Sequence, residues 1–173
     1  MKALIDKHSP LLLKQLPKGA FLTVKAEDKI NTMTIGWGHV GILWGKPVFI
    51  VYVRYSRFTY DLLLKAEDFT VNVPVDQGLQ QALRVAGTKS GRNQDKLALA
   101  GLTAHPSKTV KSPILKECDL HYECLKLYQQ TLEPALIDDT IKKRYYPEHD
   151  THVVFYGEIL AHYRLSEDAI ETE

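Results

Sequence analysis

The sequence has little cysteine, no long hydrophobic run and almost no net charge. Its two cysteines, Cys118 and Cys124, provide no disulfide framework, which favours a reducing compartment such as the cytoplasm. No stretch approaches the roughly 20 apolar residues that span a bilayer, so we expect no membrane anchor, and Lys14 interrupts the apolar patch near the N-terminus, so we expect no signal peptide. The net charge of +1 argues against a nucleic-acid binder, because phosphate neutralisation dominates such binding.

The 173 residues fit one domain, 1–173, that is large enough to bury a core without disulfides. Apolar or alternating runs predict strands over residues 20–25, 30–35, 48–53, 69–73, 120–129 and 153–163. Helical spacing predicts a helix after Ser56 and helices over residues 77–85, 94–100 and 134–146. Because strands and helices do not alternate regularly, we expect an antiparallel barrel with appended helices rather than a doubly wound parallel sheet.

The most distinctive stretch is 31–53. Residues 48–53 predict a buried strand, since they are apolar and rich in β-branched and aromatic side chains. Before it, a predicted loop interleaves Trp37 and Trp44 with glycines at positions 36, 38, 41 and 45. Such a composition can form a slot for a flat ring system. The alternative is that the tryptophans lie in the core or a dimer interface, which we favour for Trp44, whereas we assign Trp37 to the slot.

Two turns have the composition of anion sites. Residues 54–59 place Arg54, Ser56 and Arg57 where a strand leads into a helix, so that free backbone N–H groups and the helix dipole attract an anion. Residues 87–92 form a glycine-bracketed loop whose N–H groups can make an anion-binding concavity. Each turn alone also fits a simple helix cap or a flexible surface loop. Together they favour a bound phosphate.

The sequence indicates no catalytic side chain and no metal site. Cys118, His121 and Cys124 provide only three ligands, and on a strand His121 points away from the face that the cysteines share. We interpret both cysteines as buried free thiols. His39 lies in the predicted loop and is expected to be exposed, although it could line a cavity.

Four segments together resemble the flavin reductase-like family, and in particular its flavoredoxin-type branch. They are residues 31–37, 44–47, 53–59 and 87–92, which follow the order of the family within residues 18–163. The resemblance implies a mainly β fold with appended helices, the FMN-binding split β-barrel. It also implies a Greek-key antiparallel barrel that works as a homodimer, with FMN near the dimer interface.

The resemblance also implies which residues bind the cofactor. The segment 31–37 would follow the isoalloxazine ring through its backbone, and the two turns would hold the phosphate and ribityl chain. The last strand would approach the ring, from its own or the second subunit. The implied cofactor-binding residues are Asn31, Thr32, Met33, Thr34, Ile35, Gly36, Trp37, Val53, Arg54, Ser56, Arg57, Thr59, Thr88, Lys89, Ser90, Gly91, Arg92 and Tyr156. Two positions depart from the family: Tyr55 replaces a frequent proline, and Ala86 replaces a frequent cysteine, so we expect no cysteine-assisted redox chemistry.

The activity that the resemblance implies is an oxidoreductase that accepts hydride from NAD(P)H onto FMN and passes electrons to a small-molecule or protein acceptor. That hydride step needs no general acid or base. One alternative is an electron-transfer flavoprotein that a partner protein reduces, and another is a non-catalytic small-molecule binding module on the same barrel. The insertion 134–146 could cover the site and restrict the substrate. No Rossmann fingerprint indicates which pyridine nucleotide is preferred.

Overall fold

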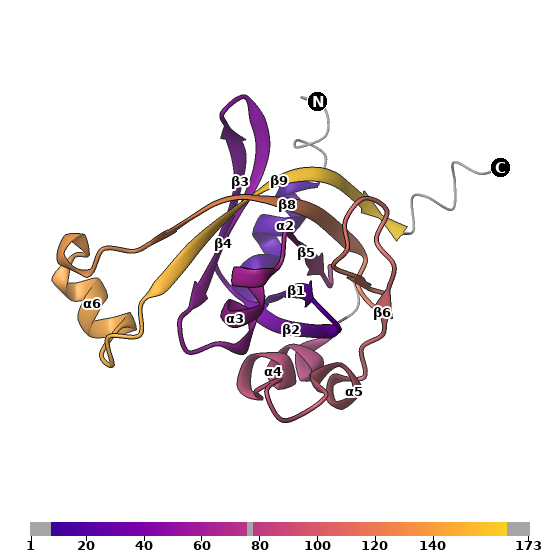
Figure 1. Ribbon diagram of the computed structural model, residues 1–173, viewed down its shortest axis with the longest axis horizontal. Helices are drawn as coiled ribbons and strands as arrows, with labels where there is room; N and C mark the ends of the chain where they lie inside the picture. The colour runs from indigo at the N-terminus through magenta and orange to yellow at the C-terminus, as the bar shows by residue number, and fades with distance from the viewer. Residues whose placement is uncertain (1–7, 76–77, 166–173) are drawn as a thin grey trace.

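The computed structural model describes residues 8–75 and 78–165, and most of its strands form one antiparallel sheet (Figure 1). Its seven strands are β1 (Ala20–Ala26), β2 (Lys29–Ile35), β3 (Gly38–Leu43), β4 (Lys46–Arg54), β5 (Asp68–Val73), β8 (Leu120–Thr131) and β9 (His152–Arg164). Their order across the sheet is β2-β1-β5-β8-β9-β4-β3. The edge strands β2 and β3 are joined by Gly36 and Trp37 alone, so the curled sheet has its gap beside this joint. The predicted antiparallel barrel with appended helices is confirmed.

Two apolar clusters stabilise the barrel and fix the helices on it. The larger cluster fills the interior around Phe49, Phe69 and Phe155, none of which is exposed. Leu63 of α3 (Phe58–Lys65) packs into this cluster. The smaller cluster joins Phe21 of β1 to the buried face of α4 (Gln80–Thr88) and to the strand pair β6 (Ala104–His105) and β7 (Ile114–Leu115). Burial of these side chains supplies the main driving force for folding.

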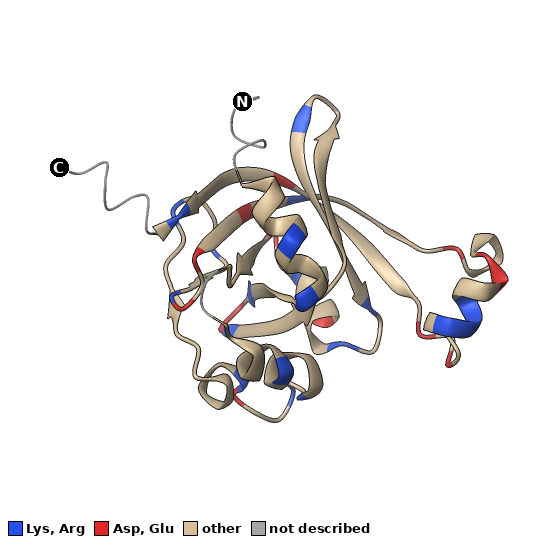
Figure 2. Ribbon diagram, turned by 180° about the vertical axis from the view of Figure 1, so that it is seen from behind, with Lys and Arg blue, Asp and Glu red and all other residues tan. Residues whose placement is uncertain are grey.

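The strands β8 and β9 continue past the barrel and carry an arm, which we define as residues 132–151 (Figure 1). The arm contains the 3-10 turn η2 (Pro134–Leu136) and the helix α6 (Asp139–Tyr145), which confirms the predicted helical insertion. Asp138 caps α6, because its carboxylate accepts hydrogen bonds from the backbone N–H groups of Thr140 and Ile141. Figure 2 shows basic and acidic segments together on α6.

The predicted loop between the strands of the 31–53 stretch is wrong, because residues 38–43 form β3 and pair with β4. Because glycines are rare in strands, the glycines of this segment favoured the prediction of a loop. Gly38 serves close packing instead: a Cβ atom there would lie 3.0 Å from the ring of Phe49. Trp44 and Gly45 form the turn into β4, with positive φ angles of 53° and 71°, as a tight hairpin requires.

Several helix details differ from the predictions. The N-cap position of α3 is Arg57 rather than Ser56, and no side chain caps it. On α3, Asp61 binds Arg92 at 2.8 Å and Lys65 binds Glu27 at 3.2 Å.

The helix α4 extends to Thr88, so the anion loop predicted from residue 87 begins inside a helix. The helices α2 (Ser9–Gln15) and η1 (Leu16–Lys18) were not predicted. The helix α5 (Lys96–Ala100) was predicted, and Gly101 caps it in the left-handed conformation. Residue 77 and the acidic tail 167–173 lie outside the described residues. No described helix is long and apolar enough to span a bilayer.

Gly157 of β9 provides a test of the barrel packing. A Cβ atom there would lie 2.5 Å from Phe69 Cζ and 2.8 Å from Cys124 Cβ. We expect Gly157→Ala to lower the free energy of unfolding by about 1–3 kcal/mol, as overpacking does, measured by urea denaturation. The matched control is Gly41→Ala on β3, where a Cβ atom meets nothing within 4 Å. Equal stability of the two variants would contradict this packing.

Candidate functional site

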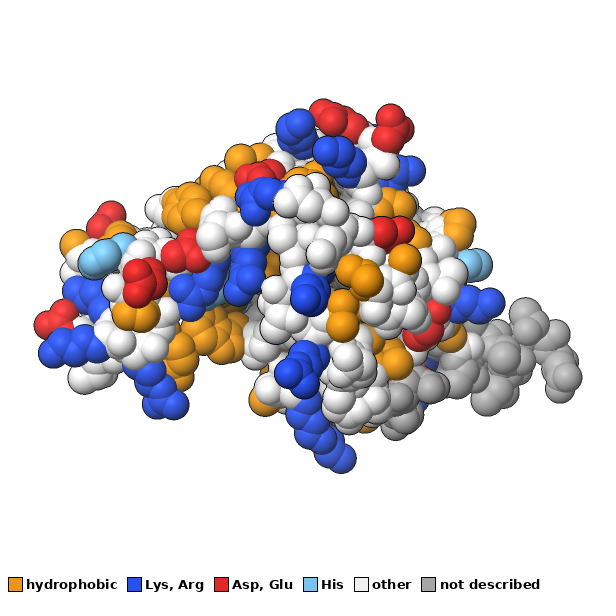
Figure 3. All heavy atoms as spheres, turned by 90° about the horizontal axis from the view of Figure 1, so that it is seen from below, with side chains coloured by type: hydrophobic (Ala, Val, Ile, Leu, Met, Phe, Trp, Pro, Cys, Tyr) orange, Lys and Arg blue, Asp and Glu red, His pale blue; other side chains and the backbone are white. Residues whose placement is uncertain are grey.

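Two adjoining cavities beside the β2–β3 joint form one groove. The basic cavity, of about 140 Å³, is lined by Asn31, Met33, Thr34, Ser56, Arg57, Phe58, Thr59, Ala86, Gly87, Thr88, Lys89, Ser90, Gly91, Arg92 and Lys96. The aromatic cavity, of about 190 Å³, is lined by Met33, Thr34, Ile35, Gly36, Trp37, Tyr52, Arg54, Arg57 and His152. The two cavities share Met33, Thr34 and Arg57, which makes the groove continuous. Figure 3 shows a hollow between the arm and the barrel in which basic and hydrophobic side chains are exposed.

The basic cavity has positive side chains in its lining and no carboxylate. Arg57, Lys89, Arg92 and Lys96 contribute the charge. Arg92 is held from outside the lining by Asp61. Lys96 is only 6% exposed, and its burial, followed by the nearby charge of Arg57, lowers its pKa to about 8. A lysine that is buried among like charges favours an anionic ligand, since an anion restores the charge that water no longer stabilises.

Close backbone packing fixes the loop that carries Lys89. The buried Asn31 of β2 donates a hydrogen bond from Nδ2 to Thr59 Oγ1 at 2.8 Å. A Cβ atom at Gly91 would lie 2.0 Å from Asn31 Oδ1, so only glycine lets the loop pass this close to β2. Thr34 donates from its hydroxyl to the carbonyl oxygen of Leu83 at 2.6 Å, which holds the end of α4 against the same strand. The cavity is therefore built from three connected elements rather than from a loose loop.

The aromatic cavity presents a flat wall. Trp37 is 41% exposed and packs between the rings of Tyr145 and His152, with centroid distances of 5.3 and 4.9 Å. His152 Nδ1 lies 2.8 Å from the hydroxyl of Tyr146. Burial, and then the charge of Arg54, lowers the pKa of His152 to about 4, so its imidazole is neutral at neutral pH. An exposed tryptophan beside a neutral imidazole suits a planar ligand.

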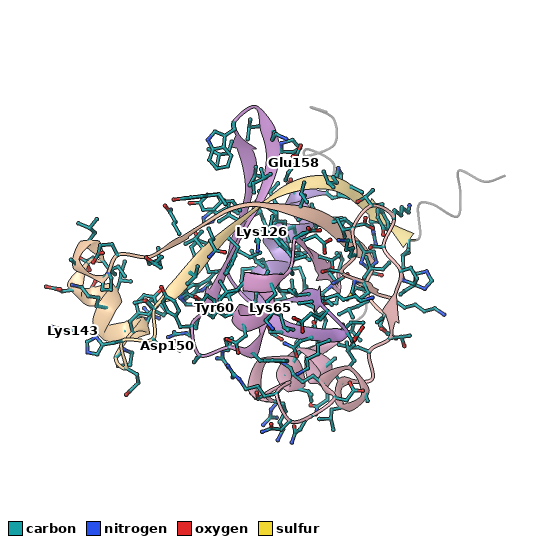
Figure 4. The ribbon with its side chains drawn as sticks, viewed as in Figure 1. Tyr60, Lys65, Lys126, Lys143, Asp150 and Glu158 are labelled. Atoms are coloured by element: carbon teal, nitrogen blue, oxygen red, sulfur yellow. The ribbon has the colours of Figure 1, made fainter. Side chains whose placement is uncertain are left out.

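Arg54 and Ser56 fasten the arm to the barrel. The guanidinium of Arg54 donates to the carbonyl oxygens of Tyr145 and Asp150, both at 2.7 Å, and lies over the ring of Tyr146. The hydroxyl of Ser56 donates to the Asp150 carboxylate at 2.6 Å, where the arm meets the barrel (Figure 4). The resemblance implied that Arg54 and Ser56 contact the phosphate. In the structure, both side chains bind the arm.

Most of the cofactor-binding residues predicted from the sequence line one of the two cavities. Thr32 does not, because its hydroxyl is bonded to Thr23 inside the barrel at 3.0 Å. Val53 does not either, since it is fully buried in the core. Tyr156 lies with Trp44 and Tyr128, at centroid distances of 6.3 and 5.4 Å, and lines neither cavity. Its approach to the ring, from its own or a second subunit, stays a prediction.

Six residues that line the groove are absent from the predicted list: Phe58, Ala86, Gly87, Tyr52, Lys96 and His152. The last three are polar and bear most on the chemistry of the site. Tyr52 stands two positions before Arg54, so strand alternation alone would have placed both on one face. Lys96 is the single charge in the otherwise apolar helix α5, which was a usable signal. His152 gives no local signal, because it reaches the site through its register opposite Arg54 in the β4–β9 pair.

Both cysteines are buried and unpaired, which confirms their interpretation as free thiols. Burial raises the pKa of each thiol, so neither is a reactive thiolate.

His121 Nδ1 lies 2.8 Å from the side-chain oxygen of Asn72. Within residues 8–75 and 78–165, no group of three or more metal-ligating side chains is arranged to hold a metal ion.

The sequence profile described as the flavin reductase like domain matches residues 15–172. The chain belongs to the flavin reductase-like family. It is 34% identical over 108 residues to an uncharacterized protein of Archaeoglobus fulgidus, a match that covers 62% of this chain and 60% of the relative. This flavin reductase-like chain therefore spans about three fifths of that relative.

Two solved structures share the fold of this flavin reductase-like chain. Flavoredoxin from Methanosarcina acetivorans is 27% identical with a TM-score of 0.64, and the match covers 84% of this chain and 67% of that one. An FMN-binding protein from Thermus thermophilus, solved with bound 1-cyclohex-2-enone, is 26% identical with a TM-score of 0.65, and the match covers 84% and 68% of the two chains. These similarities confirm the predicted split β-barrel.

The residues of the groove fit FMN. The carboxylate-free basic cavity suits a phosphate, the aromatic cavity suits the isoalloxazine ring, and the shared residues Met33, Thr34 and Arg57 lie between them. Gly91 supports this fit independently, because only a residue without a side chain leaves the loop close enough to β2 to shape the cradle.

Lys96 predicts a pH dependence of FMN binding. A phosphate stabilises the protonated amine, so the pKa of Lys96 rises from about 8 when FMN binds. Affinity is therefore full below the pKa of the FMN-free protein and falls above it, by up to about tenfold per pH unit. Fluorescence titration should show this loss with FMN, and Lys96→Met should remove it. Riboflavin has the same ring without the phosphate, so a similar loss with riboflavin would refute the phosphate role.

Proposed function

We propose that this chain is an FMN-dependent oxidoreductase that accepts hydride from NAD(P)H and passes the electrons to a small-molecule or protein acceptor. The observation that carries this proposal is the continuity of the groove. A flat aromatic cavity leads directly into a carboxylate-free basic cavity, which is the order of the ring and the phosphate in FMN. The family membership of the chain supports the same reading.

When bound, FMN supplies the redox chemistry, and the protein supplies position and electrostatics. Arg57, Lys89 and Lys96 would hold the phosphate with charge-assisted hydrogen bonds. Backbone N–H groups of residues 34–37 would stabilise negative charge on the ring, as oriented dipoles do at other developing anions. The arm contacts Trp37 through the ring of Tyr145, which would hold this wall of the aromatic cavity in place. The open side takes NAD(P)H and the acceptor in turn.

Two other functions remain as outcomes of the test. An electron-transfer flavoprotein would bind FMN in the same groove but receive its electrons from a protein, in line with the flavoredoxin similarity. A non-catalytic binding module would not retain FMN. The basic cavity favours the two flavoproteins over the module, because Lys96 is buried beside the positive charge of Arg57, which a bound anion would offset.

Reduction of the bound FMN tests the proposal. We expect the protein to hold FMN, and its visible flavin absorption to bleach when NADH or NADPH is added without oxygen. Trp37→Ala should weaken FMN binding or shift the flavin potential, because the ring loses part of its wall. Retention of FMN without bleaching by either nucleotide would favour the electron-transfer flavoprotein. Failure to retain FMN would favour the binding module.

We further propose that the chain acts in the cytoplasm as a homodimer. Unpaired cysteines suit a reducing compartment. Trp44 at the tip of the β3–β4 hairpin is 60% exposed, so it is not a core residue, and the neighbouring Tyr128 is 47% exposed. Exposed aromatic clusters of this kind are typical of protein interfaces.

Light scattering tests the homodimer. We expect the wild-type chain to have the mass of two chains and Trp44→Glu to shift it toward one, since burial of an unpaired charge in an apolar interface is strongly unfavourable. The control is Leu136→Glu on the arm, where the native side chain is 85% exposed and should tolerate a charge. A monomeric wild type, or a Trp44→Glu variant that remains dimeric, would exclude this interface.

A further inference from the structure

A tyrosine hydroxyl lines the aromatic cavity, and neither the family assignment nor the proposed hydride step uses it. Tyr52 lies on β4, two residues before Arg54, and both side chains line the cavity. Its side chain is half-buried, and burial, followed by the nearby Tyr156 and Tyr146, raises its pKa. Tyr52 is therefore a neutral phenol at neutral pH, with a proton to donate.

An exposed histidine contacts the same hydroxyl from the neighbouring strand. His39 of β3 stands opposite Ile50 of β4 in the strand register, and its Nδ1 lies 3.2 Å from Tyr52 Oη. When Nδ1 carries the proton and donates it to Tyr52 Oη, the phenol hydrogen can point into the cavity. The pair thus connects the interior of the aromatic cavity to solvent through one exposed imidazole.

The charges of the cavity indicate what kind of molecule would use this proton. Arg54 and Arg57 line the same cavity as Tyr52, and its lining contains no carboxylate. The positive charge of the two guanidinium groups, with Arg54 bound to the arm and Arg57 assigned to the phosphate, favours negative charge that develops on an oxygen atom in the cavity. A one-electron acceptor such as a ferric chelate needs neither this charge nor a proton. A carbonyl compound conjugated to a C=C bond needs both.

We propose that Tyr52 is the proton donor in the reduction of a small conjugated carbonyl compound, and that His39 reprotonates it. This inference deepens the proposed function and rests on it, since it names the class of acceptor at the same site. The T. thermophilus relative binds 1-cyclohex-2-enone, a compound of this class.

The step balances in atoms and electrons. The β-carbon of the acceptor would receive the hydride equivalent of NAD(P)H, and the electron pair of the C=C bond moves toward the carbonyl. The carbonyl oxygen then takes the proton of Tyr52, as one O–H bond breaks and another forms, and the resulting enol becomes the saturated carbonyl compound by proton exchange with solvent. Tyr52 takes the Nδ1 proton of His39, which takes another from solvent at Nε2. The acceptor gains two electrons and two hydrogens, and NAD(P)H is oxidised.

The test compares acceptors that differ in their need for a proton. Tyr52→Phe keeps the ring and removes the hydroxyl. We expect it to slow cyclohex-2-enone reduction by about 100-fold, the lower end of general acid catalysis, and to leave ferricyanide reduction within about twofold. Tyr55→Phe is the matched control, because Tyr55 is exposed in the next turn and lines neither cavity. His39→Gln should slow only the enone reaction, and added imidazole should partly restore it.

A binding measurement gives a readout that does not depend on turnover. With oxidised FMN-loaded protein, we expect Tyr52→Phe to weaken cyclohex-2-enone binding by about threefold to tenfold, because the carbonyl oxygen loses one neutral hydrogen bond. Reduction with dithionite in place of NAD(P)H separates this inference from the proposed function. If the wild-type protein reduces the enone with dithionite but not with NAD(P)H, then NAD(P)H is not the electron donor. The role of Tyr52 as proton donor stands in that case.

Three results would overturn the inference. In the first, dithionite-reduced Tyr52→Phe protein reduces the enone within about twofold of wild type, although general acid catalysis predicts a far larger loss. In the second, enone and ferricyanide reduction fall equally, which would assign Tyr52 to holding the cofactor. In the third, the dithionite-reduced wild type does not reduce the enone at all.

Discussion

The groove depends on positive charge that no carboxylate in its lining neutralises. Lys96 is buried beside Arg57, and desolvation already lowers its pKa. Burial of a charge without a partner costs roughly several kcal/mol, so the surrounding packing must hold the lysine in place. Asp95 caps α5 and Leu97 packs against the smaller apolar cluster, which fixes the helix that carries Lys96. Apolar packing thus holds Lys96 where its burial lowers the stability of the protein, and a bound anion offsets that loss. Protein stability and ligand affinity are therefore linked at Lys96.

The aromatic half of the groove is built by contacts between distant segments. Trp37 comes from the joint between the edge strands, Arg54 from the end of β4, and Tyr145 from the arm. Arg54 links the barrel to the arm, because its guanidinium binds the arm while its side chain lines the cavity. The arm is therefore part of the site rather than an independent insertion. Changes in its sequence would be expected to alter the cavity wall without altering the barrel.

The sequence predicted what depends on local pattern. The strands around Val51, Val71 and Val153 have clear apolar periodicity, and their burial follows from it. The β3 strand was missed because Gly38 signals a break, while its real role is to accommodate Phe49. Ser56 was assigned to the helix cap because capping is a local rule, yet Asp150, from a distant segment, binds its hydroxyl. His152 enters the site only through the β4–β9 register, which no single segment encodes.

The order of the strands has a consequence for synthesis on the ribosome. Within the described sheet, the β3–β4 hairpin pairs with the rest of the barrel only through β9, the last described strand, although all four strands β1 to β4 precede β5 in the chain. Tyr52 and Arg54 meet His152 only when that strand has docked. A nascent chain that lacks β9 has no aromatic cavity, even with β1, β2 and β5 already paired. Retention of the ligand would therefore report that translation has passed the final strand.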